Sequence, residues 1–174
     1  MTPRAARDDD CAAIASIWNG YIRDSLATFT TAEKTEDELR ALLADKAAAG
    51  HGVFVVEAAG AVCGFALYGQ FRGGPGYAHT MEHSLLLDPG ARGRGAGRAL
   101  MVAIEDHARA GGAHSMIAGV SAGNPDGVAF HAAIGYREVA RLPQVGRKFG
   151  RWLDLVVMQK MLGGGPTDRG FETR

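Results

Sequence analysis

The sequence predicts an α/β domain of the α+β type, with a mixed, mostly antiparallel central sheet of about seven strands and flanking helices. Segments with apolar residues at helical spacing alternate with short runs rich in valine, leucine and aromatic residues. The predicted order is strand, two helices, three strands, helix, strand, helix and two strands. A three-strand meander followed by one strand–helix–strand crossover is not the repeated crossover pattern of a doubly wound parallel sheet.

The predicted helices begin and end at residues that favour helix termini. Asp8–Asp10 precede the first helix, whose apolar side chains recur at helical spacing from Cys11 to Ile22. The capping box at residues 35–38 begins the second helix, which ends near Gly50. Two further helices, each followed by glycine, are expected over residues 95–110 and 125–134.

The predicted strands are short and are separated by turn residues. They cover residues 3–6, 53–57, 62–68, 79–87, 115–120, 136–142 and 152–161. The second and third strands are joined by the tight turn Ala58-Ala59-Gly60, which indicates a β-hairpin.

Length and composition indicate one compact domain, expected over residues 1–162, followed by a loose tail at 163–174. Lysine plus arginine equals aspartate plus glutamate, 19 against 19, so no nucleic-acid partner is expected. No apolar run approaches the roughly 20 residues of a membrane span, so no membrane association is expected. Cys11 and Cys63 are too few for a disulfide framework, and a cytoplasmic protein is the simplest interpretation.

The strongest functional signal is a glycine- and arginine-rich loop between a predicted strand and a predicted helix. It reads Leu85-Leu-Leu-Asp-Pro-Gly-Ala-Arg92-Gly-Arg-Gly-Ala-Gly-Arg98. Glycines let backbone N–H groups approach a ligand, the helix N-terminus adds partial positive charge, and the arginines add full charge. A plain glycine-rich turn before a surface helix is the alternative. The Walker sequence Gly-Lys-Ser/Thr is absent, and Arg98 stands where the GxGxxG fingerprint requires glycine.

The spacing Arg92-x-x-Gly95-x-Gly97 resembles the pyrophosphate loop of the GNAT superfamily of N-acetyltransferases. Residues 124–136, NPDGVAFHAAIGY, resemble the second motif of that superfamily. Residues 19–29, 80–84 and 145–154 resemble a narrower branch, the phosphinothricin and methionine sulfoximine N-acetyltransferases. The resemblance covers residues 1–162 and implies the GNAT fold.

The resemblance implies acetyl-CoA as co-substrate and direct attack by an amine in a ternary complex. The residues that it assigns to the coenzyme are Leu85, Leu86, Leu87, Arg92, Gly93, Arg94, Gly95, Ala96, Gly97, Arg98 and Asn124. The strand at 85–87 is expected to splay from its neighbour and to offer free backbone groups. Asn124 is equally suited to cap the helix that follows it. Neither cysteine has an activating partner nearby in sequence, so no covalent acyl-enzyme is expected.

Two residues are candidates for proton transfer. Glu82 matches the family glutamate in Thr-(Val/Met)-Glu-(His/Ser)-Ser and is the candidate base, directly or through water, the alternative being a solvent-facing strand carboxylate. His131 occupies the position where many GNAT enzymes use tyrosine to protonate the thiolate, and the alternative is a structural helix histidine. Tyr136 is expected in the core. Strand alternation separates His79 and His83 from Glu82, so no metal site is expected.

The candidate acceptor residues are Phe29, Phe71, Arg72, Tyr77 and Lys148. Arg72 suits a substrate carboxylate or phosphinate, and a solvated loop arginine is the alternative. Two positions depart from the family pattern. Ala78 stands where relatives often have arginine, which argues against phosphinothricin-like specificity. Gly127 replaces the usual serine or alanine and is expected to loosen its helix.

The basic and aromatic segment 145–154 corresponds to a family region near the acceptor site and a dimer interface, so a homodimer is expected; a plain hairpin loop is the alternative. The predicted function is acetyl transfer from acetyl-CoA to the primary amine of a small amino-acid-like molecule, of the phosphinothricin or methionine sulfoximine type. Transfer to a protein N-terminus or polyamine is one alternative. A non-catalytic acyl-CoA sensor is another, against which the retained Glu82 and the intact loop at 92–98 argue.

Overall fold

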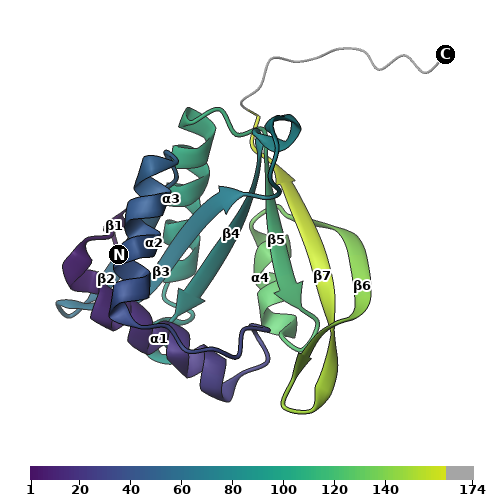
Figure 1. Cartoon of the computed structure of the whole chain (residues 1–174), viewed down its shortest axis with the longest axis horizontal. Helices are drawn as coiled ribbons and strands as arrows, with labels where there is room; N and C mark the ends of the chain where they lie inside the picture. Colours follow the sequence, from purple (N-terminus) through teal and green to yellow (C-terminus); the bar gives the residue numbers. More distant parts are fainter. Residues whose placement is uncertain (164–174) are drawn as a thin grey trace.

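The computed structural model describes residues 1–163, and its helices and strands follow the predicted order (Figure 1). The elements are β1 (Arg4–Ala5), α1 (Cys11–Asp24), α2 (Glu36–Ala48), β2 (Val53–Ala58), β3 (Ala61–Gln70), β4 (Thr80–Leu87), α3 (Ala96–Ala110), β5 (Ser115–Ser121), α4 (Pro125–Ala133), β6 (Arg137–Lys148) and β7 (Arg151–Met161). Apart from Gly163, the expected tail at 163–174 lies outside the described residues.

The strands form one seven-stranded sheet in the order β1-β2-β3-β4-β5-β7-β6. Every neighbouring pair is antiparallel except β4 and β5, which are parallel and are connected through α3. The prediction of a mixed, mostly antiparallel sheet is therefore confirmed.

Helices cover both faces of the sheet (Figure 1). On one face, Ile14 of α1 and Leu39 of α2 pack with Val55 and Phe65 in one buried cluster. On the other face lies a second cluster, formed by α3, α4 and the strands; its buried members include Leu100, Ile104, Met81, Met116 and Tyr136. The expected core position of Tyr136 is confirmed. No helix within residues 1–163 is long and apolar enough to span a membrane.

The parallel pair β4 and β5 separates before either strand ends. Their pairing covers residues 80–83 and 115–118 and stops there, whereas β4 continues to Leu87 and β5 to Ser121. Figure 1 shows the two strands diverging toward their carboxyl ends. Beyond His83, β4 still pairs with β3, but no strand of the described residues pairs with its other edge. The expected splay is confirmed, and it leaves backbone polar groups available to a ligand.

The strand boundaries differ from the sequence prediction at the end of the chain. The prediction ended the sixth strand at 142, directly before Pro143, a residue type that sheets accept mainly at edges and bulges. The strand instead continues to Lys148 through a bulge between Leu142 and Gly146, where Gln144 adopts a positive φ of 52°. The segment 145–154 is therefore the paired end of a long hairpin and not an open loop.

Candidate functional site

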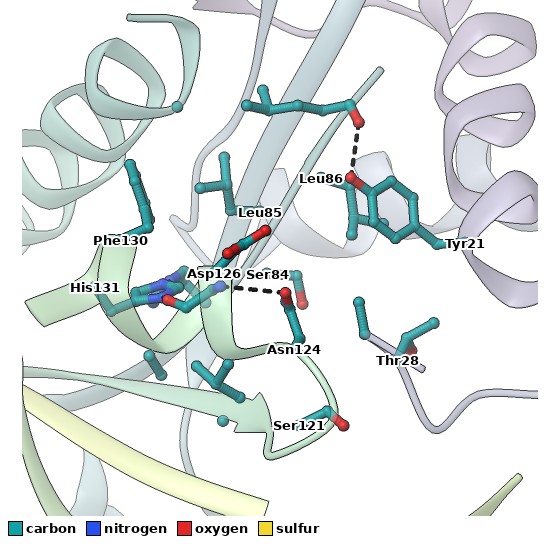
Figure 2. A pocket seen from close by; sticks show the side chains of 18 of the residues that line it. Tyr21, Thr28, Ser84, Leu85, Leu86, Ser121, Asn124, Asp126, Phe130 and His131 are labelled. Carbon is teal, nitrogen blue, oxygen red and sulfur yellow. Dashed lines mark hydrogen bonds between the residues drawn. The ribbon is translucent and has the colours of Figure 1, made fainter. Parts of the chain in front are cut away.

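The separation of β4 and β5 opens a cleft of about 710 Å³. Most of the predicted coenzyme residues line it: Leu85, Leu86, Leu87, Arg92, Gly93, Gly95, Gly97, Arg98 and Asn124. Figure 2 shows Tyr21 and Thr28 on one wall, Phe130 and His131 on the other, and Ser84 and Leu85 between them. Arg94 is exposed and Ala96 is buried in the first turn of α3, and neither lines the cleft.

The glycine-rich loop leaves the N-terminus of α3 open toward the cleft. Gly93 and Gly95 have positive φ values of 71° and 83°, which favour glycine, and Gly95 is the N-cap of the helix. No side chain of residues 1–163 caps α3, whereas the Thr35 side chain accepts a hydrogen bond from the first turn of α2. The first N–H groups of α3 are therefore free for an anion, as in other phosphate-binding helix termini.

Gly97 is required by packing and not by backbone conformation. A Cβ atom at Gly97 would lie 3.2 Å from Phe130 Cζ and 3.3 Å from Leu87 Cδ1. These contacts are tighter than ordinary van der Waals separations, so the glycine lets the first turn of α3 approach β4 and α4 closely. The loop is thus packed closely against β4 and the α4 wall of the cleft at this point.

Tyr21 was missed by the sequence analysis as a site residue. Its hydroxyl donates to the Leu87 carbonyl at 2.8 Å and accepts from Arg92 Nη2 at 2.8 Å. The Arg92 guanidinium also lies 5.6 Å from the centre of the Tyr21 ring. Tyr21 thus orients the first arginine of the loop. Its position in an amphipathic helix suggested core packing, and no local signal distinguishes the two roles.

Replacing Tyr21 with phenylalanine should raise KM for the expected coenzyme about fivefold, because one hydrogen bond that orients Arg92 contributes about 1 kcal/mol. We expect kcat to change little. A double-mutant cycle with Arg92→Ala checks the cause: the Tyr21 effect should largely vanish when Arg92 is absent. Fully additive effects in steady-state kinetics would show that Tyr21 does not act through Arg92.

Asn124 has the capping role that was one of its two expected roles, and its contact with the coenzyme stays a prediction. Its Oδ1 accepts from the Gly127 N–H at 3.1 Å, which caps α4, and the residue also lines the cleft (Figure 2). A Cβ atom at Gly127 would collide with the Asn124 side chain in this position. The glycine at 127 therefore leaves room for the capping amide.

His131 is paired with a second histidine on β4. The two Nε2 atoms of His83 and His131 lie 3.0 Å apart, and His131 Nδ1 lies 2.7 Å from the Gly127 carbonyl. A carbonyl only accepts, so His131 Nδ1 carries a proton. Burial lowers the pKa of both rings, that of His83 to about 3. In the neutral pair, His83 Nε2 must therefore donate to His131 Nε2.

Glu82 lies at the point where the two strands separate. Its side chain points to the sheet face covered by α1 and α2, and an ideal Cβ at Gly119 would lie 3.3 Å from its Oε1. Gly119 is the first residue of β5 beyond the parallel pairing. Burial raises the pKa of the Glu82 carboxyl above its ordinary value. Within residues 1–163, no ion pair or hydrogen bond engages this carboxylate.

A second cavity of about 300 Å³ adjoins the cleft. It is lined by Lys46, Leu67, Gly69, Gln70, Glu82, His83, Ser84 and Gly119. Three of these residues, His83, Ser84 and Gly119, also line the larger cleft. The two cavities therefore meet in the split of the sheet, with Glu82 on one face and His131 on the other. In residues 1–163 there is no group of three or more potential metal-binding side chains.

The candidate acceptor residues are not brought together. Phe29 lines the larger cleft, and its ring packs against Gly146 of β6. Phe71, Arg72 and Tyr77 lie in the connection between β3 and β4 and line neither cavity. That connection is fastened by the Gln70 side chain, which donates to the carbonyl groups of residues 72 and 74 at 2.6 and 2.8 Å.

The expected acceptor contact of Lys148 needs correction. The side chain is buried, and its ammonium donates to the backbone carbonyls of Tyr21, Ser25 and Thr28 at 3.1, 2.7 and 2.9 Å. Three carbonyl groups leave no donor for a substrate. Lys148 instead fastens the segment after α1 to the β6–β7 hairpin, which places Thr28 and Phe29 in the wall of the cleft.

The fold, the cleft and the loop with an open helix N-terminus are together typical of one class of protein, transferases that use a phosphate-containing coenzyme. Residues 14–136 match the Acetyltransferase (GNAT) family. The chain belongs to this family and is an acetyl-CoA-dependent N-acetyltransferase.

Relatives cover nearly the whole chain. An L-amino acid N-acyltransferase of Escherichia coli is 40% identical over 162 residues, 93% of this chain and 94% of that protein. A phosphinothricin N-acetyltransferase of Alcaligenes faecalis is 36% identical, over 95% and 85% of the two chains. The solved structure of a Salmonella typhimurium acetyltransferase with its cofactor acetyl-CoA has a TM-score of 0.89 at 38% identity, over 93% and 94%.

Proposed function

We propose that this chain acetylates the primary amine of a small amino-acid-like molecule in the cytoplasm, as a single domain over residues 1–162. The observation that carries the proposal is the Glu82 carboxylate, which lies where the coenzyme cleft meets the second cavity. The relatives act on L-amino acids and phosphinothricin according to their names, which supports this acceptor class.

The larger cleft fits acetyl-CoA. The open N-terminus of α3 and the exposed side chains of Arg92 and Arg98 suit a diphosphate. The unpartnered edge of residues 84–87 suits the amide groups of the pantetheine arm. Arg94 is exposed in the same loop, and we propose that its charge attracts the diphosphate at long range without a fixed contact to it. When bound, acetyl-CoA supplies the activated acetyl thioester.

Glu82 is proposed as the general base. An amine is mostly protonated near neutral pH, and only its neutral form attacks a thioester. The Glu82 carboxylate lines the second cavity, is exposed and has no protein partner within residues 1–163, so it is available to take the ammonium proton directly or through water. The pKa of Glu82 is raised and so lies closer to neutral pH, which favours transfer of the proton to this carboxylate.

The pair His83 and His131 is proposed to protonate the thiolate of coenzyme A, which is the leaving group. His131 lines the cleft on the face opposite Glu82, so proton removal and proton delivery are separated across the sheet. In the neutral pair, the proton between the two Nε2 atoms belongs to His83. A neutral pair can protonate the thiolate only after it has taken up one proton, such as one released by the attacking amine, because loss of the Nε2 proton from neutral His83 would leave an imidazolate. His83 and His131 would therefore work as a unit.

The function is tested by a thiol-release assay with acetyl-CoA over L-amino acids, methionine sulfoximine, phosphinothricin, polyamines and a peptide with a free N-terminus. We expect turnover on one or more of the amino-acid analogues. Turnover on only the peptide or polyamines would select the other acceptor class. If acetyl-CoA binds but none of these amines is acetylated, this acceptor class is rejected.

A homodimer is proposed through the outer strands of the sheet. Large apolar side chains are exposed by 42% to 59% along β6, its turn and the start of β7: Val139, Leu142, Val145, Phe149 and Trp152. Exposed apolar residues in such number on an edge hairpin favour association. The same hairpin contacts the cleft wall: Gly146 packs against Phe29, and Lys148 donates to the Thr28 carbonyl. Association through the hairpin would therefore restrict the movement of this wall.

Trp152→Glu should convert the dimer to a monomer, because it places a charge on the most exposed aromatic side chain of this surface. Multi-angle light scattering should give about twice the 18.3 kDa chain mass for the wild type and one chain mass for the variant. Val102→Glu on α3 is the matched control, since Val102 is 52% exposed elsewhere. A monomeric wild type would exclude the dimer.

A further inference from the structure

The second cavity contains a cation that the sequence analysis did not consider. Lys46, near the C-terminal end of α2, lines this cavity together with Glu82. Its Nζ lies over Gly69, so close that a Cβ atom at that glycine would collide with it. Gly69 of β3 is directly opposite Glu82 of β4 in the antiparallel register. The ammonium and the carboxylate therefore occupy neighbouring positions on the same face of the sheet.

Neither group is neutralised by the protein. Within residues 1–163, Lys46 forms no ion pair, and Glu82 forms none either. Lys46 is half-buried, and burial lowers the pKa of its ammonium, as burial raises the pKa of Glu82. A partly desolvated ammonium without a counter-ion is unfavourable until an anion reaches it. The cavity thus presents one unpaired cation and one unpaired carboxylate to whatever enters it.

This pair of charges complements an amino acid. The ammonium of a zwitterion matches Glu82, and its carboxylate matches Lys46. The volume of about 300 Å³ is at the lower end for ligand sites, which suits a single small molecule. Gly69 and Gly119 keep the space between the two charges open, because a side chain at either position would fill it.

We propose that Lys46 binds the carboxylate of the acceptor and selects α-amino acids over simple amines, polyamines and peptide N-termini. This proposal rests on the proposed acetyltransferase function. It assigns the anion contact to α2 and not to the loop that contains Arg72, which lines neither cavity. It also accounts for Ala78: with a cation already at 46, the acceptor anion does not need an arginine there.

The test compares L-methionine sulfone with its α-carboxamide, which lacks the negative charge. Lys46→Met should raise KM for the acid about 10- to 50-fold and change kcat less than about threefold, because Lys46 binds the acceptor but takes no part in proton transfer. KM for the carboxamide should stay within about twofold of the wild type. Lys46→Arg should restore most of the affinity for the acid. Arg40→Met, on an exposed part of the same helix, is the control.

Calorimetry separates failure of this proposal from failure of the proposed function. L-Methionine sulfone is titrated into the wild type and Lys46→Met with coenzyme A present, so no turnover is needed. We expect at least about tenfold weaker binding by the variant. Equal affinities, or no binding to the wild type, would overturn the Lys46 assignment whether or not the enzyme is active. Binding that depends on Lys46 without acetyl transfer to the amino acid would retain the Lys46 site and reject the proposed acetylation of amino acids.

Discussion

Glu82→Gln should lower kcat/KM by about 10²- to 10³-fold, the usual contribution of a general base. The amide keeps the size of the side chain but cannot accept the ammonium proton. The protein should fold normally, because Glu82 forms no ion pair or hydrogen bond within residues 1–163 that the change would break. Glu33→Gln, at an exposed carboxylate paired only with Arg23, is the matched control. Turnover by Glu82→Gln within twofold of the wild type would remove Glu82 from the mechanism.

The pH profile gives this prediction a second readout. Only the ionised carboxylate can act as a base, so kcat/KM should fall as the pH decreases through the pKa of Glu82. Burial raises that pKa, so the acidic limb should lie above the ordinary glutamate value of 4.5. The limb should be absent from the residual activity of Glu82→Gln. An unchanged limb in the variant would assign it to another group.

The second large effect is expected in the coenzyme loop. Gly95→Val should raise KM for acetyl-CoA about 10- to 100-fold, because a β-branched residue is strained at a φ of 83° by about 1–3 kcal/mol. The loop would relax away from the left-handed conformation and turn its N–H groups from the cleft. No atom lies within 4 Å of the added Cβ, so the effect isolates backbone conformation. Initial rates over a range of acetyl-CoA concentrations measure it.

Gly60→Val is the control that separates the effect of backbone strain on stability from its effect on coenzyme binding. Gly60 has a φ of 79° in the β2–β3 turn, also with no atom within 4 Å of an added Cβ, and it lines neither cavity. Both variants should lose similar stability in urea unfolding, but only Gly95→Val should lose affinity for the coenzyme. Equal KM values for the two variants would show that the loop conformation does not determine coenzyme binding.

The acceptor alternatives make different demands on the charges that surround Glu82. A polyamine site would need an acidic groove, whereas the second cavity holds Lys46 beside a single carboxylate. A peptide N-terminus carries no carboxylate next to its amine, so it would leave Lys46 unpaired. The charges of the cavity therefore favour a free amino acid, and the kinetics of Lys46 variants decide between these acceptors.

Local sequence patterns predicted the order of helices and strands and most of the residues that line the coenzyme cleft, but not the arrangement of the second cavity. The capping box at Thr35 and Glu38 forms as predicted, because both partners lie within one helical turn. The conformation of the loop before α3 is local in the same way, because glycines at 93 and 95 allow the positive φ values found there. The close packing of Gly97 against Leu87 and Phe130, in contrast, depends on the tertiary structure. The element order follows from periodicity, which is also local.

Only the tertiary structure decided which side chains share a site. Lys46 and Glu82 are brought to one face by the packing of α2 on β3, and Tyr21 meets Arg92 across 71 residues of sequence. Lys148 is of a residue type that often binds anionic substrates. In the folded chain, however, its ammonium donates hydrogen bonds to three backbone carbonyl groups. Where a side chain points between elements depends on their mutual packing, which periodicity and spacing do not specify.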